Sequence, residues 1–116
     1  MKAILIDVKN QEIKEIEHDN TLENIYDLID CRVFDVVRID DVNSIFVDDE
    51  GLLQQNQLYF SYNDRALAGS GLILGVDNAG ESIASTLTVE DVEAKVQWLS
   101  EGYAIEPEIK VSAWRF

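Results

Sequence analysis

The run KAILIDV (residues 2–8), followed after Lys9 and Asn10 by QEIKEIEH (residues 11–18), decides the class of fold. Apolar and polar residues alternate along both runs, which is typical of strands that have one face in a core. Two such strands separated by two residues predict a β-hairpin. Asn10 tolerates the positive φ that a turn of this length requires. The hairpin indicates a fold built on an antiparallel sheet.

Two further segments predict helices. The first, over about 21–30, follows a capping residue, Asn20 or Thr21, and has apolar residues at helical spacing: Leu22, Ile25, Tyr26 and Ile29. The second, over about 88–100, opens with Thr88-Val89-Glu90-Asp91, which is close to a capping box. Its apolar stripe consists of Val89, Val92, Val96 and Leu99.

Runs of β-branched or alternating residues predict further strands, at residues 33–39, 45–47, 72–76, 81–84 and 108–116. The segment 52–62 is ambiguous, and we expect Leu58, Tyr59 and Phe60 to return to the core. We therefore predict a single α+β domain over residues 1–116. An antiparallel sheet of about five to seven strands should pack against two helices.

The charge of the chain excludes several classes of partner. Its 116 residues include 23 acidic and nine basic side chains, a formal net charge of −14. Such a surface repels nucleic acid and anionic membranes, because both are polyanions. No apolar run is long enough to span a bilayer, and the first residues do not resemble a signal peptide. We expect a cytoplasmic protein that binds neither nucleic acid nor membrane.

The residues offer no convincing catalytic or metal-binding arrangement. His18 lies between Glu17 and Asp19, and we expect an exposed turn residue rather than a general base. Cys31 is expected to be a small buried hydrophobe. Asp48-Asp49-Glu50-Gly51 lacks the ligand spacing of a calcium loop and predicts a hairpin turn. We predict no enzymatic activity, no metal and no cofactor.

Gly69, Ser70 and Gly71 form a candidate ligand segment. A phosphate cradle needs a helix after it, whereas Leu72–Val76 predicts a strand. Ser70 also lacks the frame of a nucleophile elbow. Close packing or a bulge explains the glycines, and a backbone-lined pocket for a small ligand is the alternative. Such a pocket should include at least one basic side chain: Arg38, Arg65 or Lys95.

The acidic half of the chain is the second candidate site. Residues 11–50 contain 13 acidic and three basic residues. These carboxylates either keep the protein soluble or imitate the charge density of a nucleic acid. The predicted turn residues Asp40, Asp41, Asp48, Asp49 and Glu50 are the candidate partner-binding face. Trp98 and Trp114, if exposed, are candidate aromatic anchors.

Four stretches resemble a family of small bacteriophage and mobile-element proteins, a domain of unknown function: residues 1–7, 22–29 followed by 34–37, 45–52 and 67–75. The resemblance covers about residues 1–83 and leaves 84–116, with the second helix and final strand, as an extension. It carries no catalytic motif. It implies a phage or plasmid setting, in which small acidic proteins often inhibit host defences.

These observations predict a non-enzymatic acidic module that binds the basic surface of a host protein. An inhibitor of a nucleic-acid-handling defence protein, acting by mimicry of nucleic-acid charge, fits this description. The alternative is a small-ligand or nucleotide-binding protein that uses residues 69–75. The first should show a contiguous acidic face, and the second a pocket lined by backbone amides.

Overall fold

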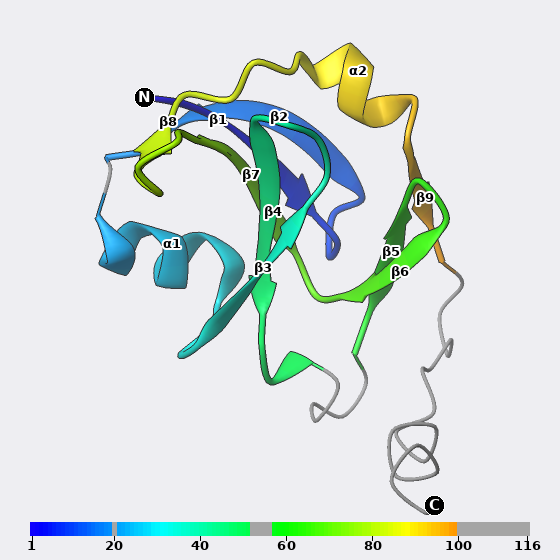
Figure 1. Ribbon diagram of the computed structural model, residues 1–116. Helices are drawn as coiled ribbons and strands as arrows, with labels where there is room; N and C mark the ends of the chain where they lie inside the picture. The colour runs from blue at the N-terminus through cyan, green and yellow to red at the C-terminus, as the bar shows by residue number, and fades with distance from the viewer. Residues whose placement is uncertain (20, 52–56, 100–116) are drawn as a thin grey trace, which may run out of the picture.

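A mainly antiparallel β fold with two helices is seen in the computed structural model, which describes residues 1–19, 21–51 and 57–99 (Figure 1). Five strands form the main sheet in the order β2-β1-β7-β4-β3, and a sixth, β8, pairs with β7. Their bounds are β1 Lys2–Asp7, β2 Glu12–Glu17, β3 Phe34–Arg38, β4 Asn43–Asp48, β7 Gly71–Val76 and β8 Ser82–Ile83. Every pairing is antiparallel.

A second antiparallel sheet has the order β6-β5-β9. Its strands are β5 Tyr59–Tyr62, β6 Arg65–Ala68 and β9 Val96–Trp98. Asn63 and Asp64, at the β5–β6 turn, both have positive φ, as a two-residue hairpin turn of type I′ requires. Strand β6 was not among the predicted strands, because its Arg-Ala-Leu-Ala sequence contains no β-branched residue.

The core consists of two clusters on opposite faces of the main sheet. Side chains alternate along β1, β4 and β7, so each strand contributes to both clusters. One face carries Ala3, Leu5, Phe46, Leu72 and Leu74, packed against Ile25 and Ile29 of α1 (Leu22–Ile29). The other carries Ile4, Ile6, Ile45, Val47 and Ile73, packed against Phe60, Leu67 and Val92.

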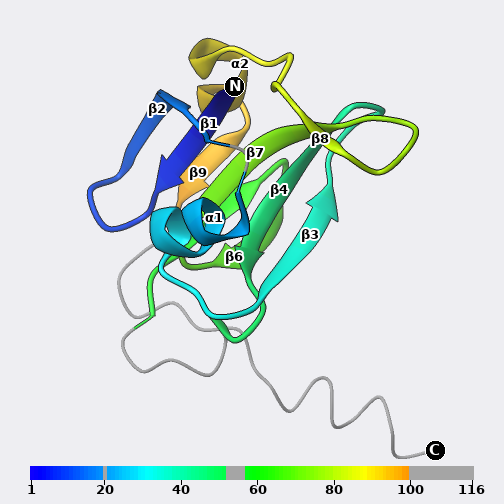
Figure 2. The same cartoon turned by 90° about the vertical axis from the view of Figure 1, so that its left-hand side faces the viewer.

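The main sheet is therefore the middle layer of the molecule. Figure 1 shows α1 on one side and the second sheet on the other, and Figure 2 shows α1 in front of the central strands. The prediction of antiparallel strands with two helices is confirmed. Packing against two helices describes the arrangement loosely, because the second sheet, joined by the short α2 (Val89–Glu93), covers the second face.

The first helix forms where the sequence predicts it. Thr21 is its N-cap and accepts a hydrogen bond from the backbone N–H of Asn24. Asp30 ends it in the left-handed conformation, with φ of 54°. Ile25 and Ile29 are buried against the sheet.

The second predicted helix is wrong in length. Thr88 and Asp91 form the expected capping box, but α2 ends at Glu93, and residues 96–98 form strand β9. Val96 and Trp98 pair with Tyr62 and Phe60 of β5. The stripe of the sequence fits a helix and a turn followed by a strand equally well, and β9 satisfies an edge of β5 that would otherwise be unpaired. The predicted strand 108–116 and Trp114 lie outside the described residues.

The first hairpin is confirmed with a longer turn than predicted. Asp7 pairs with Glu12, which leaves four residues in the loop. Gln11, and not Asn10, has positive φ, at 52°. Asn10 instead donates its side-chain amide to Asp7 Oδ2 over 2.8 Å.

Candidate functional site

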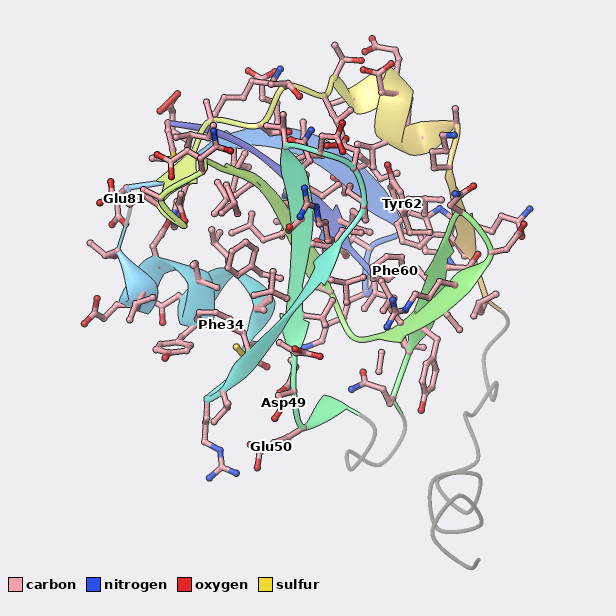
Figure 3. All side chains as sticks on the ribbon, viewed as in Figure 1. Phe34, Asp49, Glu50, Phe60, Tyr62 and Glu81 are labelled. Carbon is pink, nitrogen blue, oxygen red and sulfur yellow. The ribbon has the colours of Figure 1, made fainter. Side chains whose placement is uncertain are left out.

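The five predicted partner-binding carboxylates do not form one face. Asp40 and Asp41 lie at the β3–β4 turn, whereas Asp48, Asp49 and Glu50 lie at the far end of β4. Figure 3 shows Asp49 and Glu50 at that end. The six residues of β4 separate the two groups by about 17 Å, at roughly 3.3 Å per residue. The predicted contiguous face is therefore wrong for these residues.

Asp40 closes the β3–β4 turn. Its Oδ1 accepts hydrogen bonds from the backbone N–H groups of Val42 and Asn43, over 2.7 and 2.6 Å. Burial acts to raise the pKa of Asp40, but the hydrogen bonds from Asn43 and Val42 and the charge of Arg38 outweigh it, so the pKa falls below its ordinary value. This carboxylate stabilises the hairpin.

Asp48 is buried and was wrongly expected to be exposed in a turn. It is the last residue of β4, and its Oδ1 accepts a hydrogen bond from the backbone N–H of Glu50 over 2.9 Å. Glu50 forms an ion pair with Arg32, with 3.0 Å between Nη2 and Oε1. Of these three acidic residues, only Asp49 is fully exposed at the end of the strand.

Three carboxylates from separate parts of the chain meet at one pocket instead. Asp7 at the end of β1, Asp30 at the end of α1 and Asp48 at the end of β4 line a cavity of about 340 Å³. Lys9 is the basic residue of its lining, and Gln57 and Ser70 are among its polar residues. The apolar part of the wall consists of Leu5, Val8, Leu28, Ile29 and Leu58. We call it the carboxylate pocket.

The carboxylate pocket has a negative potential for two reasons. Asp7 is charged at neutral pH: burial acts to raise its pKa, but hydrogen bonds from Asn10 and Lys9 and the charge of Lys14 lower it overall. The C-terminus of α1, where Asp30 lies, adds the negative end of the helix dipole. A cation is the ligand that this arrangement favours.

The residues of the predicted ligand segment have two different roles: Gly71 allows close packing, whereas Gly69 and Ser70 line the carboxylate pocket. A Cβ on Gly71 would lie 2.8 Å from Ile45 Cγ2 and 3.1 Å from Phe60 Cζ, so close packing explains this glycine. Gly69 and Ser70 line the carboxylate pocket. Ser70 Oγ also accepts a hydrogen bond from the backbone N–H of Val8, which fixes the β1–β2 loop. The expected basic partners Arg38, Arg65 and Lys95 are not part of this lining.

His18 is buried, so the expected exposed position is wrong. Its Nδ1 lies 2.6 Å from Asn24 Oδ1 and donates to it, since a carbonyl oxygen has no proton to give. Its backbone also bonds to Met1 in both directions. His18 joins the end of the first hairpin to the first turn of α1, a connection that neighbouring acidic residues in the sequence do not reveal.

Cys31 and Trp98 have structural positions. Cys31 is half-buried against the cluster beneath α1. Burial, with the charges of Asp48 and Asp30, raises the pKa of its thiol to about 11, so it is protonated at neutral pH and a poor nucleophile. Trp98 is half-buried against the other cluster rather than freely exposed.

The described residues contain neither a metal-binding cluster nor a helix that could cross a membrane. Within 1–19, 21–51 and 57–99, no three His, Cys, Asp or Glu side chains are grouped so that they could hold a metal ion. The helices of this same part of the chain are too short or too polar to cross a membrane.

Comparison with known proteins identifies the family but no activity. The family model described as "Domain of unknown function (DUF3846)" matches residues 1–97, past the expected limit at residue 83 and including α2. A curated relative, "Uncharacterized protein y4iR" of Sinorhizobium fredii, is 28% identical over 93 residues, which cover 77% of this chain and 58% of that protein. The chain thus spans little more than half of that relative, and no solved structure matches it. Because the family model covers most of the chain, the protein belongs to the DUF3846 family.

Proposed function

We propose that this protein is a non-enzymatic module that binds a basic protein surface, of the kind that otherwise holds nucleic acid. The observation that carries the proposal is a row of exposed carboxylates on α1: Glu23, Asp27 and Asp30. None of the three forms an ion pair or a side-chain hydrogen bond with a described residue. Glu23 lies in the first turn of α1, where a carboxylate suits the helix dipole, but Asp27 and Asp30 have no such local role.

The spacing of this row resembles that of a nucleic-acid strand. At 1.5 Å per residue, the three positions rise along the helix by about 6 and 4.5 Å. One strand of DNA carries a charge per about 3.4 Å of its axis. The two charge densities agree within a factor of about two, so a groove that holds a phosphate backbone is a suitable partner surface.

The position of Asp27 and Asp30 favours a partner over solubility alone. Both lie at the C-terminal end of α1, where the helix dipole is negative and no basic residue occupies the last turn. An acidic side chain there destabilises a helix by about 0.3–1 kcal/mol. Carboxylates at other surface positions would keep the protein equally soluble without destabilising α1. A role in binding would explain why these two are at the end of the helix.

The carboxylate pocket extends the row, because Asp30 belongs to both. Its apolar walls suit the aliphatic stem of a lysine or arginine, and its carboxylates suit the charged head. A basic side chain of the partner is therefore the expected occupant. The nucleotide alternative is disfavoured at this pocket, because the phosphates would face Asp7, Asp30 and Asp48.

The experiment compares two variants with the same change in net charge. One replaces Glu23 with Gln and Asp27 and Asp30 with Asn. The control replaces Glu81, Glu90 and Glu93, all exposed, with Gln. Proteins captured from bacterial lysate at low salt are tested for release by duplex DNA and for binding to each variant.

The proposal expects capture that DNA competes away, loss of binding in the α1 variant and retention in the control. If both variants lost binding equally, net charge and not the position of the carboxylates would be the cause. If DNA did not displace the captured protein, the partner surface would not be one that binds nucleic acid.

A further inference from the structure

A second pocket lies between the two sheets, away from α1. It has a volume of about 190 Å³ and lies where β3 and the β5–β6 hairpin approach each other. Its polar lining consists of Arg38, Arg65, Tyr62 and Asn63, and its apolar lining includes Val37 and Ile45. Figure 3 shows Tyr62 near the turn of the second sheet, on the opposite side of the molecule from Phe34.

Two guanidinium groups at one pocket are unusual in a chain with nine basic and 23 acidic residues. The side chain of Arg65 makes no ion pair and no hydrogen bond with any residue that the structure describes. Its charge is therefore not neutralised by a specific contact. Arg32, by contrast, forms an ion pair with Glu50.

Arg38 is held in place by backbone carbonyl oxygens, and its charge also lowers the pKa of the nearby Asp40 carboxyl. Its Nε donates to the backbone oxygen of Asp40 over 3.1 Å, and its Nη2 donates to that of Asp41 over 3.3 Å. Carbonyl oxygens fix the side chain but carry no formal charge. A guanidinium has five N–H donors, so donors remain after these two hydrogen bonds.

Tyr62 adds a neutral donor to the pocket. Burial, with the charges of Asp40 and Asp91, raises the pKa of its hydroxyl above the ordinary value, so the proton is retained. Asn63, in the adjoining turn, brings a side-chain amide with two further N–H groups.

The size of the pocket limits the ligand. At about 30 Å³ per liquid water, 190 Å³ corresponds to roughly six waters. Pockets for drug-sized molecules have about 300–1,000 Å³. The space suits a tetrahedral or planar anionic group and is too small for a nucleotide.

We propose that this pocket binds a small oxyanion, a phosphate or carboxylate group, through Arg65 and Arg38 with Tyr62 and Asn63 as further donors. Arginine binds both anions bidentately, through parallel N–H groups. The anion arrives either free in solution or as a side-chain group of a partner. This site is independent of the acidic row on α1 and would remain if the proposed function failed.

The test is an NMR titration of arginine side-chain and backbone N–H signals. Sodium phosphate, sodium acetate and a short phosphoserine peptide are added separately, with sodium chloride holding the ionic strength constant. We expect saturable shifts at Arg38, Arg65 and the backbone of residues 62–67. Tighter binding of the peptide than of phosphate would show that the anion comes from a side chain of a partner. Tighter binding of phosphate or acetate would show that it is a free anion.

Two variants decide the assignment. Arg65→Gln removes the unpaired guanidinium, and we expect it to weaken binding of the best anion by at least about tenfold, because charge-assisted hydrogen bonds are lost. Arg32→Gln is the matched control, since it removes the same charge from an exposed arginine elsewhere; it should leave the affinity unchanged. Unsaturable shifts in the native protein, or equal affinities in Arg65→Gln and the native protein, would overturn the proposal.

Discussion

Neutralising the end of α1 should stabilise this protein. Asp27 lies in the last turn of the helix and Asp30 is its C-cap, so both charges face the negative end of the dipole. Removing such a charge is worth about 0.3–1 kcal/mol at low ionic strength. Asp27 also lies four residues from Glu23, and like charges at this spacing cost about 0.2–0.5 kcal/mol.

The double variant Asp27→Asn, Asp30→Asn is therefore expected to raise the free energy of unfolding by about 0.8–2.5 kcal/mol. Asn accepts the left-handed conformation of residue 30, so the backbone there should not change. In a domain of this size, 1 kcal/mol corresponds to a shift of several degrees in Tm. Urea denaturation and thermal melting at 10–20 mM salt measure the effect, which should shrink in ~0.5 M salt because of screening.

Glu23→Gln is the control for this reasoning. Glu23 lies in the first turn of α1, where a carboxylate stabilises the helix. Its removal loses that contribution and relieves the repulsion of Asp27, so we expect no change or a small loss of stability. If Glu23→Gln stabilised the protein as much as Asp27→Asn, the cause would be net charge, and the dipole argument for a binding role would fail.

Three other predictions concern residues that hold the fold. Gly71→Ala should destabilise the protein by about 1–3 kcal/mol in urea denaturation, because its Cβ would overlap Ile45 and Phe60; an unchanged midpoint would show that the sheets can separate. His18→Ala should cost about 1–3 kcal/mol by the same assay, because it opens a buried space and removes the partner of Asn24, whereas exposed Lys14→Ala should change little. Asp40→Asn should destabilise the protein at pH 7 but less at pH 3: the pKa of Asp40 in the folded state is below its ordinary value of 3.8, so its contribution is present above that pH and is lost as pH falls. An equal effect of Asp40→Asn at both pH values would show that the charge is not involved.

The strands with strong local patterns were predictable. The alternation of residues 2–17, the apolar run at 72–74 and the cap at Thr21 each specify an element without help from the rest of the chain. The structure of residues 89–99 was not predictable, because apolar residues at three- and four-residue spacing fit one long helix as well as a helical turn followed by a short strand. Only the unpaired edge of β5, distant in sequence, selects the strand.

The carboxylate pocket could not be predicted for a different reason. Its acidic residues lie at positions 7, 30 and 48, at the ends of β1, α1 and β4, which the sequence alone gives no reason to bring together. The predicted partner-binding face consisted of the densest acidic runs, at 40–41 and 48–50, but strand β4 holds those two runs apart. Charge density along a chain is therefore a poor guide to charge density on a folded surface.

The hydrogen bonds of the carboxylates separate the two uses of acidity in this protein. Asp7, Asp40 and Asp48 each accept a backbone N–H next to the end of a strand, so each has a role in closing a turn. Glu23, Asp27 and Asp30 accept nothing among the described residues, and the last two lie where they weaken their own helix. The fold accounts for the first group and for Glu23 in the first turn of α1, but not for Asp27 and Asp30. If binding to a basic partner is the reason for Asp27 and Asp30, variants that remove these two charges should be more stable but bind the partner less tightly. Variants of the turn carboxylates should be less stable.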